Sequence, residues 1–200
     1  MEQPLNKTQA NERASKKIIP WPSLSAEALR IPLDLPLSDT GNAKRFVLRH
    51  GSDVRFCHPW RRWLVWNGRC WVRDNTGEIL RRGKRTVEIM YEEALLAYDR
   101  KSYADWAVRS DDLRRINAMI RLAESEPEIP VLPGELDCDS WLLTVDNGTI
   151  DLRTGDLHQH RREDLITKCA SVAYDVDASC EAWLGFLDQT MGGDKSMLEF

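Results

Sequence analysis

The sequence WRRWLVWNGRCWVRD, residues 60–74, places Asn67-Gly68 between two apolar runs. An Asn-Gly pair in this setting predicts a β-hairpin with a two-residue turn. Counting outward from the turn gives three cross-strand pairs, which are Trp66 with Arg69, Leu64 with Trp71, and Arg62 with Arg73. The alternation of a strand puts these six side chains on one face. The other face carries Trp63, Val65, Cys70 and Val72, is apolar, and is therefore the expected core face.

The face that holds the arginines and tryptophans has two interpretations. Arg62 opposite Arg73 is a like-charge pair, which destabilises a sheet unless an anion lies nearby. A phosphate backbone would supply that anion, and Trp66 or Trp71 would then stack on a base. Alternatively, the guanidinium groups stack on tryptophan rings, or an acidic side chain such as Glu78 covers them. The residues alone leave both interpretations open.

A second cationic group lies just before a helix expected at residues 87–98. It is either a solvated loop or a contact for DNA phosphates, and such a contact weakens steeply as salt rises. Together with the hairpin it completes the candidate nucleic-acid-binding residues, which are Arg62, Trp66, Arg69, Trp71, Arg73, Arg81, Arg82, Lys84 and Arg85.

The remaining elements surround this hairpin. Apolar residues at three- and four-residue spacing predict further helices at about 39–50, 110–123 and 179–191. Ser38-Asp39-Thr40 would cap the first, Ser110 or Asp111 the second, and Leu113, Ile116 and Ile120 of the second would face inward. The last would bury Trp183, Phe186 and Leu187.

A second hairpin is predicted around Asn147-Gly148. With a two-residue turn, its apolar face holds Leu143, Val145, Ile150 and Leu152, and its polar face holds Thr144, Asp146, Thr149 and Asp151. Strands and helices are segregated along the chain rather than alternating, so we expect an α+β fold in which antiparallel hairpins flank a helical middle. Three parts are expected: a flexible proline-rich tail at 1–37, an α+β domain at 38–191, and at 192–200 the start of a helix that leads into a longer protein.

The composition narrows the function classes. The 200 residues are 42% hydrophobic and 30% charged, which excludes a wholly disordered or collagen-like chain. No apolar run is long enough for a membrane helix, so no membrane partner is expected. The net charge of −4 conceals a basic segment at 44–85, with twelve Lys/Arg against three Asp/Glu, and an acidic one at 124–199, with five against seventeen. The basic segment would meet an anion, and the acidic segment a neighbouring subunit or domain.

Neither a catalytic nor a metal site is predicted. The five cysteines are odd in number and lack a CxxC pair, which is typical of reduced thiols in a cytosolic protein. His158 and His160 share a strand face, with Asp151 expected opposite His158, but a metal would need more ligands. Asp111-Asp112 suit a helix N-terminus, and no nucleophile and base can be assembled.

Two stretches resemble a known family. They are DTGNAKRFVLRHGSDVRFCHPWRRWLVWNGRCWVRD, residues 39–74, and DNGTIDLRTGDLHQHRREDLITKCASVAYDVDA followed by WLGFL, within residues 146–187. Together, in this order, they resemble the N-terminal region of phage and plasmid primase/helicase proteins. The same region is found in the poxvirus primase-helicase ahead of a superfamily III helicase.

The resemblance implies a cytoplasmic replication module that contacts single-stranded or forked DNA and positions a hexameric helicase. ATP and magnesium would belong to a helicase domain beyond Phe200, because Gly192-Gly193-Asp194-Lys195-Ser196 lacks the glycine spacing of a phosphate loop. This chain itself would hold no cofactor. The alternatives are a complete ATP-dependent helicase, if the protein continues, and a tryptophan-rich module that binds carbohydrate or peptide.

Overall fold

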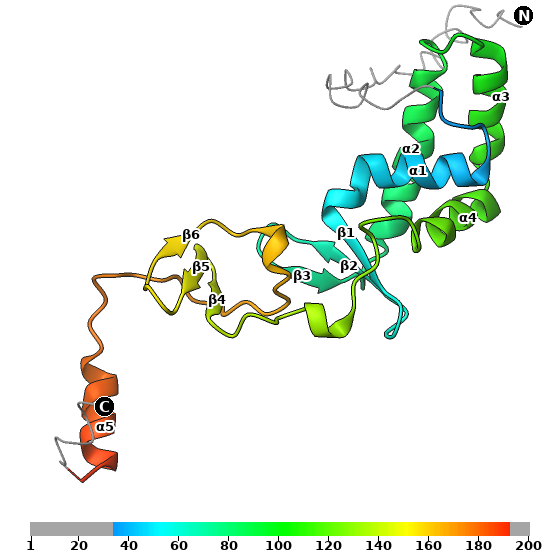
Figure 1. The fold of residues 1–200 in the computed structure, drawn as a ribbon. Coiled ribbons are helices and arrows are strands. Elements are labelled where there is room, and N and C mark those ends of the chain that lie inside the picture. Colours follow the sequence, from blue (N-terminus) through cyan, green and yellow to red (C-terminus); the bar gives the residue numbers. More distant parts are fainter. Residues whose placement is uncertain (1–33, 193–200) are drawn as a thin grey trace, which may run out of the picture.

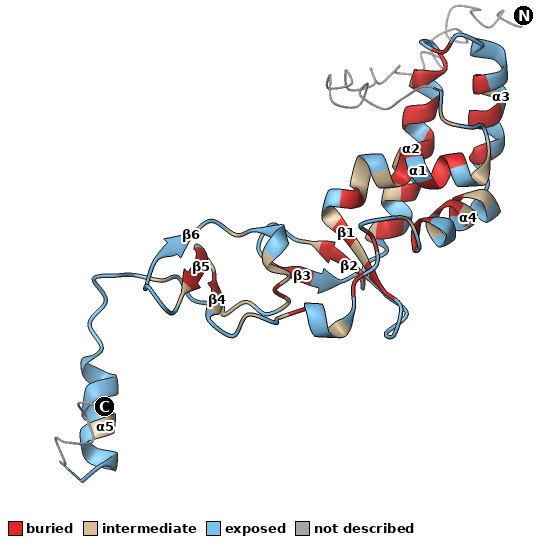
Figure 2. Cartoon of the chain, viewed as in Figure 1, coloured by how far each residue is buried: buried red, intermediate tan, exposed pale blue. Residues whose placement is uncertain are grey.

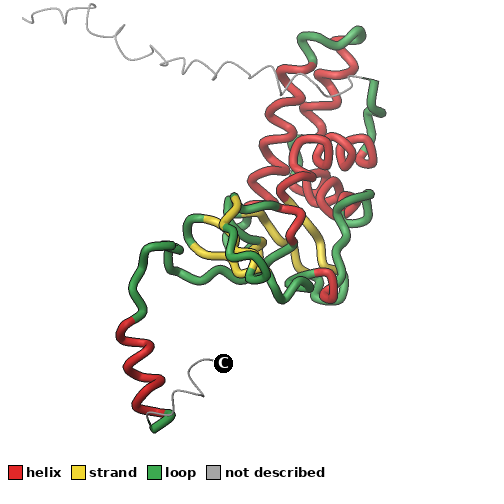
Figure 3. The backbone as a smooth tube through the Cα atoms, turned by 60° about the vertical axis from the view of Figure 1, so that its left-hand side comes forward, coloured by secondary structure: helices red, strands yellow, loops and turns green. Residues whose placement is uncertain are grey.

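The computed structural model describes residues 34–192 and has an α+β fold, as the sequence predicts (Figure 1). Most of the expected tail, 1–37, and of the expected linker, 192–200, lies outside the described residues. The helices are α1 (Asp39–His50), α2 (Glu78–Glu93), α3 (Arg100–Ser110), α4 (Leu113–Ala123) and α5 (Glu181–Thr190). The strands are β1 (Val54–Cys57), β2 (Arg62–Trp66), β3 (Trp71–Arg73), β4 (Leu142–Val145), β5 (Gly148–Asp151) and β6 (Leu157–His158). Helices α1–α4 gather at one end, and the two small sheets follow (Figures 1 and 3).

Helix α1 begins and ends where the sequence predicts. The Ser38 hydroxyl accepts from the Gly41 N–H at 3.1 Å and caps the helix. Helix α2, in contrast, begins at Glu78, well before the expected start at residue 87, and ends at Glu93. The Asp74 carboxylate accounts for this, because it accepts from the N–H groups of Glu78 and Ile79 at 2.9 and 3.0 Å and so caps the first turn. The basic residues at 81–85 are therefore helical, and their prediction as a loop is wrong.

Helix α3 was not predicted, and the start of α4 was placed too early. Ser110 and Asp111, the expected caps, lie at the end of α3, and Asp112 caps α4 by accepting from the Arg114 N–H at 2.9 Å. Leu113 therefore lies in the first turn of α4 and is exposed, against expectation, whereas Ile116 is buried. The charged and polar residues of α3 obscure its period, although its inner face buries Trp106.

A buried polar network joins α1, α2 and α3. The Arg45 guanidinium donates to the Tyr103 hydroxyl at 3.1 Å, and that hydroxyl donates to the Glu93 carboxylate at 2.7 Å. Burial, and then the bond to Glu93, raise the pKa of Tyr103 to about 12. Arg45 also donates to the carbonyls of Leu35 and Pro36 at 2.7 and 2.9 Å. The network thus fixes the point at which the described chain enters the helical unit.

Strands β1, β2 and β3 form an antiparallel sheet, here called sheet A, whose register differs from the prediction. Trp66 pairs with Trp71 and Leu64 with Arg73, so the loop between β2 and β3 has four residues rather than two. The Asn67 side-chain oxygen accepts from the N–H groups of Arg69 and Cys70, both at 2.9 Å, and stabilises this longer loop. Arg62 lies opposite Cys57 of β1, so the expected Arg62–Arg73 pair does not form.

Both faces of sheet A contribute side chains to apolar clusters, and Figure 2 shows buried residues in the sheet. Val65 and Trp63 pack against the helices, as expected of the core face. The face expected to be open carries Leu64 and Trp71, and Trp71 is only 1% exposed. Val72, expected in the core, is exposed instead. The interpretation in which this face is open is therefore wrong for Trp71, because a second apolar cluster with Val131 and Leu136 covers it, whereas Arg62 and Arg73 are exposed.

The chain beyond α4 supplies this cover and lines the edges of sheet A. The Phe56 N–H of β1 donates to the Ile129 carbonyl at 2.8 Å, and the Val131 N–H donates to the Phe56 carbonyl at 3.0 Å. At the other edge, the Trp71 N–H donates to the Ile166 carbonyl at 2.8 Å. These contacts satisfy strand edges and attach the acidic half of the chain to the basic half.

Strands β4, β5 and β6 form sheet B, and its register also differs from the prediction. Val145 pairs with Gly148, so the two-residue loop is Asp146-Asn147 rather than Asn147-Gly148. The expected polar face is partly interior, since Thr144 and Thr149 are buried and their hydroxyls lie 3.1 Å apart in a hydrogen bond. On the expected apolar face, Val145 and Ile150 are buried but Leu143 and Leu152 are exposed. His158 lies opposite Thr149, and its expected pairing with Asp151 is wrong.

Helix α5 stands apart from both sheets (Figures 1 and 3). None of its residues is buried, and the stacked rings of Trp183 and Phe186 are 58% and 54% exposed. The prediction that Trp183, Phe186 and Leu187 face inward is therefore wrong in this structure. Within residues 34–192, no helix has both the length and the apolar character needed to cross a membrane.

Candidate nucleic-acid interface

A groove of about 280 Å³ opens beside the edge of sheet A. Its lining includes Trp60, from the turn between β1 and β2, and Arg73, at the end of β3. Trp60 is 39% exposed, and the guanidinium carbon of Arg73 lies over its ring, 5.6 Å from the centroid. An accessible aromatic face next to a cation is the combination that binds single-stranded nucleic acid. The other lining residues are Leu64, Trp71, Val72, Asn75 and Thr167.

The predicted base-stacking residues, Trp66 and Trp71, do not supply the exposed ring of this groove. Trp71 contributes to the floor of the groove, where its indole N–H donates to the Arg162 carbonyl at 2.9 Å and the Arg55 guanidinium covers its ring at 4.9 Å. Trp66 packs edge-to-face on Trp71, and the Arg162 guanidinium lies 5.8 Å from its centroid. For these two rings the structure matches the alternative interpretation, in which arginines stack on the tryptophans.

Trp60 is the residue that the sequence reasoning missed. It follows Pro59 and precedes Arg61-Arg62, and the stretch VRFCHPW, residues 54–60, predicts a strand that includes it. Cys57 is the last residue of β1, so Trp60 lies in a turn, where a side chain is free of the sheet's alternation. The signal available was the proline immediately before it, since proline is uncommon within a paired strand.

The predicted cations fall into two groups. Arg62, Arg73 and Lys84 are exposed and have no ion-pair partner among residues 34–192. Their charges are therefore available to an external anion. Arg62 and Arg73 belong to sheet A, whereas Lys84 lies on α2.

The second group is paired within the chain. Arg81 and Arg82 both bond to Glu78, at 2.8 and 2.9 Å, and these bonds, led by that from Arg82, lower the pKa of Glu78. Arg85 pairs with Glu88 at 3.1 Å. Arg69 pairs with Asp146 of the acidic half at 2.5 Å. These four residues are partly neutralised, and pairs as exposed as these contribute little to stability.

The histidines and cysteines make other contacts. A ring nitrogen of His158 lies 2.8 Å from the Gln159 carbonyl, and one of His160 lies 3.5 Å from the Asp146 carbonyl. All five cysteines are free. In the part of the chain that the structure describes, no three His, Cys, Asp or Glu side chains gather in a way that could hold a metal ion.

Comparison with known protein families gives a match over most of the chain. A sequence model described as D5 N-terminal like matches residues 43–192, which include α1 through α5 apart from the first residues of α1. No curated protein matches this chain. The match spans both hairpins and the helical middle, so it covers the second stretch that carries the resemblance in full and the first from residue 43 onward.

Proposed function

Because the chain belongs to the D5 N-terminal-like family, the N-terminal domain of primase-helicase proteins, we propose that it is a replication module that binds single-stranded or forked DNA. In this proposal it positions a hexameric superfamily III helicase on the DNA and performs no chemical step itself. ATP and magnesium would be bound by the helicase, not by the residues described here. Phage or plasmid replication is the setting that the resemblance favours.

The groove with Trp60 and Arg73 is the observation that supports this proposal. Stacking of one base on an aromatic ring contributes about 1–3 kcal/mol, and the exposed Trp60 face offers such a platform. Arg73 beside it and Arg62 on the neighbouring strand have no carboxylate partner among the described residues, so both can neutralise phosphates. Base and phosphate contacts at one site are what a sequence-tolerant DNA groove requires.

Fluorescence anisotropy with a labelled oligothymidylate tests the proposal. The doubly substituted Arg62→Ala, Arg73→Ala protein is expected to bind several-fold more weakly than the unsubstituted chain. The slope of log K against log salt should fall by about 1.4, because two single-strand phosphate contacts are lost. Arg81→Ala with Arg85→Ala is the matched control, since it removes two arginines that are already paired with Glu78 and Glu88.

Unchanged binding by the doubly substituted protein would remove this groove from the DNA path. Binding of oligosaccharide in place of DNA, with no dependence on salt, would favour the carbohydrate-binding alternative, because stacking on a sugar does not release counterions.

A further inference from the structure

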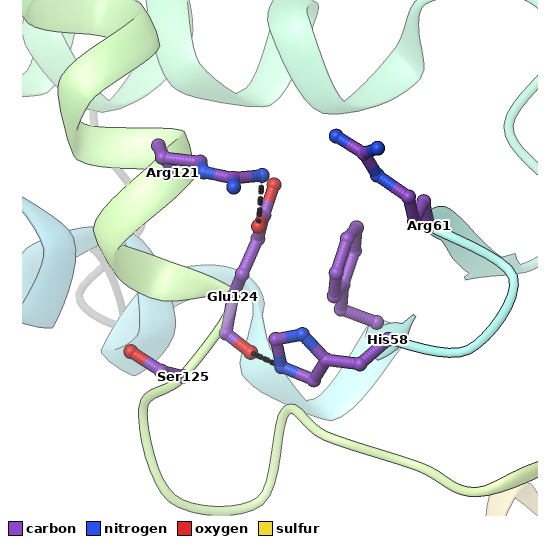
Figure 4. Close-up of a pocket in the computed structure, with 6 residues that line it drawn as sticks. His58, Arg61, Arg121, Glu124 and Ser125 are labelled. Atoms are coloured by element: carbon purple, nitrogen blue, oxygen red, sulfur yellow. Dashed lines mark hydrogen bonds and ion pairs between the residues drawn. The ribbon is translucent and has the colours of Figure 1, made fainter.

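The turn between β1 and β2 borders a second pocket, of about 400 Å³, which is separate from the groove with Trp60. Its walls are the turn itself and the C-terminal end of α4 with the residues that follow (Figure 4). The lining residues are Phe56, His58, Arg61, Arg121, Glu124 and Ser125. Trp60 lines the groove and Arg61 lines the pocket, so neighbouring residues of one turn serve the two sites.

Arg61 is held in an unusual conformation that supplies one wall of the pocket. Its φ angle is +52°, in the left-handed region that residues other than glycine seldom adopt. Such conformations persist where the surrounding structure imposes them, and they are found at ligand-binding sites. The Arg61 N–H donates to the His58 carbonyl at 3.1 Å and closes the turn. Among residues 34–192 no carboxylate pairs with the Arg61 guanidinium, which reaches over the pocket in Figure 4.

The opposite wall carries a second guanidinium, that of Arg121. One of its nitrogens donates to the Glu124 carboxylate at 2.8 Å, which leaves most of its five N–H donors unused. Arg121 and Arg61 extend toward the same space from opposite sides (Figure 4). Two arginine forks that converge in this way match the geometry with which arginine binds phosphate.

Specific contacts hold the two walls of the pocket together. A ring nitrogen of His58 lies 3.1 Å from the Glu124 carbonyl, and because a carbonyl only accepts, that nitrogen carries the proton. The Phe56 ring packs edge-to-face against His58 at 4.8 Å, and Phe56 is itself buried in sheet A. The turn that carries Arg61 is thus tied to the end of α4, which carries Arg121.

We propose that this pocket binds a phosphodiester of the same DNA strand whose base stacks on Trp60, a step that rests on the proposed function. Two guanidinium groups and the Glu124 carboxylate give the pocket a net charge of +1, which balances the single charge of a backbone phosphodiester. A terminal phosphate carries nearly twice that charge at neutral pH. The strand would cross the turn, with a base on one side and its neighbouring phosphate on the other.

Three variants test this assignment in the oligothymidylate assay. Arg61→Gly removes the guanidinium and suits the left-handed backbone, so the protein should keep or raise its melting temperature while its DNA affinity falls several-fold. The slope of log K against log salt should drop by about 0.7, the value for one single-strand phosphate. Glu124→Gln should instead tighten binding, because it removes the competing carboxylate and frees Arg121. Arg114→Ala, a fully exposed arginine on the same helix, is the control and should leave affinity unchanged.

The outcomes separate this inference from the proposed function. Arg61→Gly with unaltered affinity and slope, in an assay where the Arg62, Arg73 double variant loses binding, overturns the pocket and leaves the replication role intact. Absence of DNA binding by the unsubstituted chain overturns both. An oligonucleotide with a 5′-phosphate that binds much more tightly than its 5′-hydroxyl counterpart, only while Arg61 is present, would reassign the pocket to a strand end.

Discussion

Sheets A and B each contain a hairpin with an Asn-Gly dipeptide, yet they use it in different ways. In sheet A, Gly68 lies in the loop with a φ of +96°, and Asn67 caps the N–H groups of the loop. In sheet B, Gly148 is the first residue of β5 and lies opposite Val145. Both hairpins were predicted to have a two-residue loop formed by Asn-Gly. In sheet A the loop is longer, with four residues, whereas in sheet B it keeps two residues but lies one residue earlier in the chain.

Burial explains the difference. A two-residue shift keeps each side chain on its face, so it changes cross-strand partners without exchanging inside for outside. In sheet A the shift aligns Trp66 with Trp71 and lets their rings pack at 5.7 Å inside the second apolar cluster. In sheet B the close approach of β6 requires a residue without a side chain at 148, because a Cβ there would lie 2.5 Å from the His158 carbonyl oxygen. The dipeptide marks a turn, and packing decides its register.

The largest expected effect concerns two residues, one in each sheet, whose burial is the opposite of what the sequence predicts. Trp71 was expected on an open face and is buried, whereas Leu143 was expected on a buried face and is 42% exposed. Trp71→Ala should lower the free energy of unfolding by about 3–5 kcal/mol, as for other buried aromatic truncations. Leu143→Ala should cost less than about 1 kcal/mol, because little area is lost from the core. Urea denaturation followed by circular dichroism measures both, and equal costs would contradict the assignment.

The sequence predicts the class of fold but not which side chains are buried. Segregated strands and helices and the Ser38 cap are local signals, and the structure confirms them; the period of α4 correctly predicts a helix that buries Ile116, but not the exposure of Leu113. The prediction that one face of sheet A is open was wrong because the residues that cover this face, within 131–136 and at 165, are distant in sequence. The predicted start of α2 was wrong because Asp74 caps the helix from four residues before Glu78, outside the usual capping position.

The candidate site shows the same division. Arginine-rich composition identified the basic half of the chain, but individual roles depend on pairing partners that no local pattern reveals. Arg69 pairs with Asp146 across the two halves, whereas Arg73 lies beside Trp60 with no carboxylate partner among residues 34–192. Arg61 and Arg121 are brought to one pocket only because His58 ties the turn to the end of α4. Tertiary contacts of this kind require the structure.

A smaller effect distinguishes the two glycines. Gly148→Ala should destabilise sheet B by roughly 1–3 kcal/mol, because the added methyl group meets backbone that cannot move aside. Gly68→Ala meets no neighbouring atom, so its cost is the strain of the left-handed backbone, about 1 kcal/mol. Hydrogen exchange by peptide should locate the first effect in β4–β6 and the second in β2–β3. Faster exchange of sheet A in the Gly148 variant would instead show that the sheets unfold as one unit.

The smallest effect is a pH dependence on the side of sheet A that faces the helices. His50 packs edge-to-face on Phe46, with its ring 3.2 Å from the Thr86 hydroxyl, and burial lowers its pKa to about 4, assisted by the nearby Arg82 and Arg49. Between pH 4 and pH 6.5, His50 is largely protonated in the unfolded chain but largely neutral in the folded chain. This contribution to stability is therefore complete above about pH 6.5 and declines as pH falls, by about 1 kcal/mol at pH 5.5.

His50→Gln should be less stable than the unsubstituted chain at pH 7 if it loses packing, but its stability should change less between pH 7 and pH 5.5. The comparison of slopes, rather than of absolute stabilities, is the informative measurement, because carboxylates that titrate at lower pH contribute equally to both proteins. Guanidinium denaturation at the two pH values gives the slopes while screening exposed ion pairs such as Arg69–Asp146, which join sheet A to sheet B. An unaltered pH dependence in the variant would place the titrating group elsewhere, and would mean that the helical face of sheet A is no more sensitive to protons than sheet B.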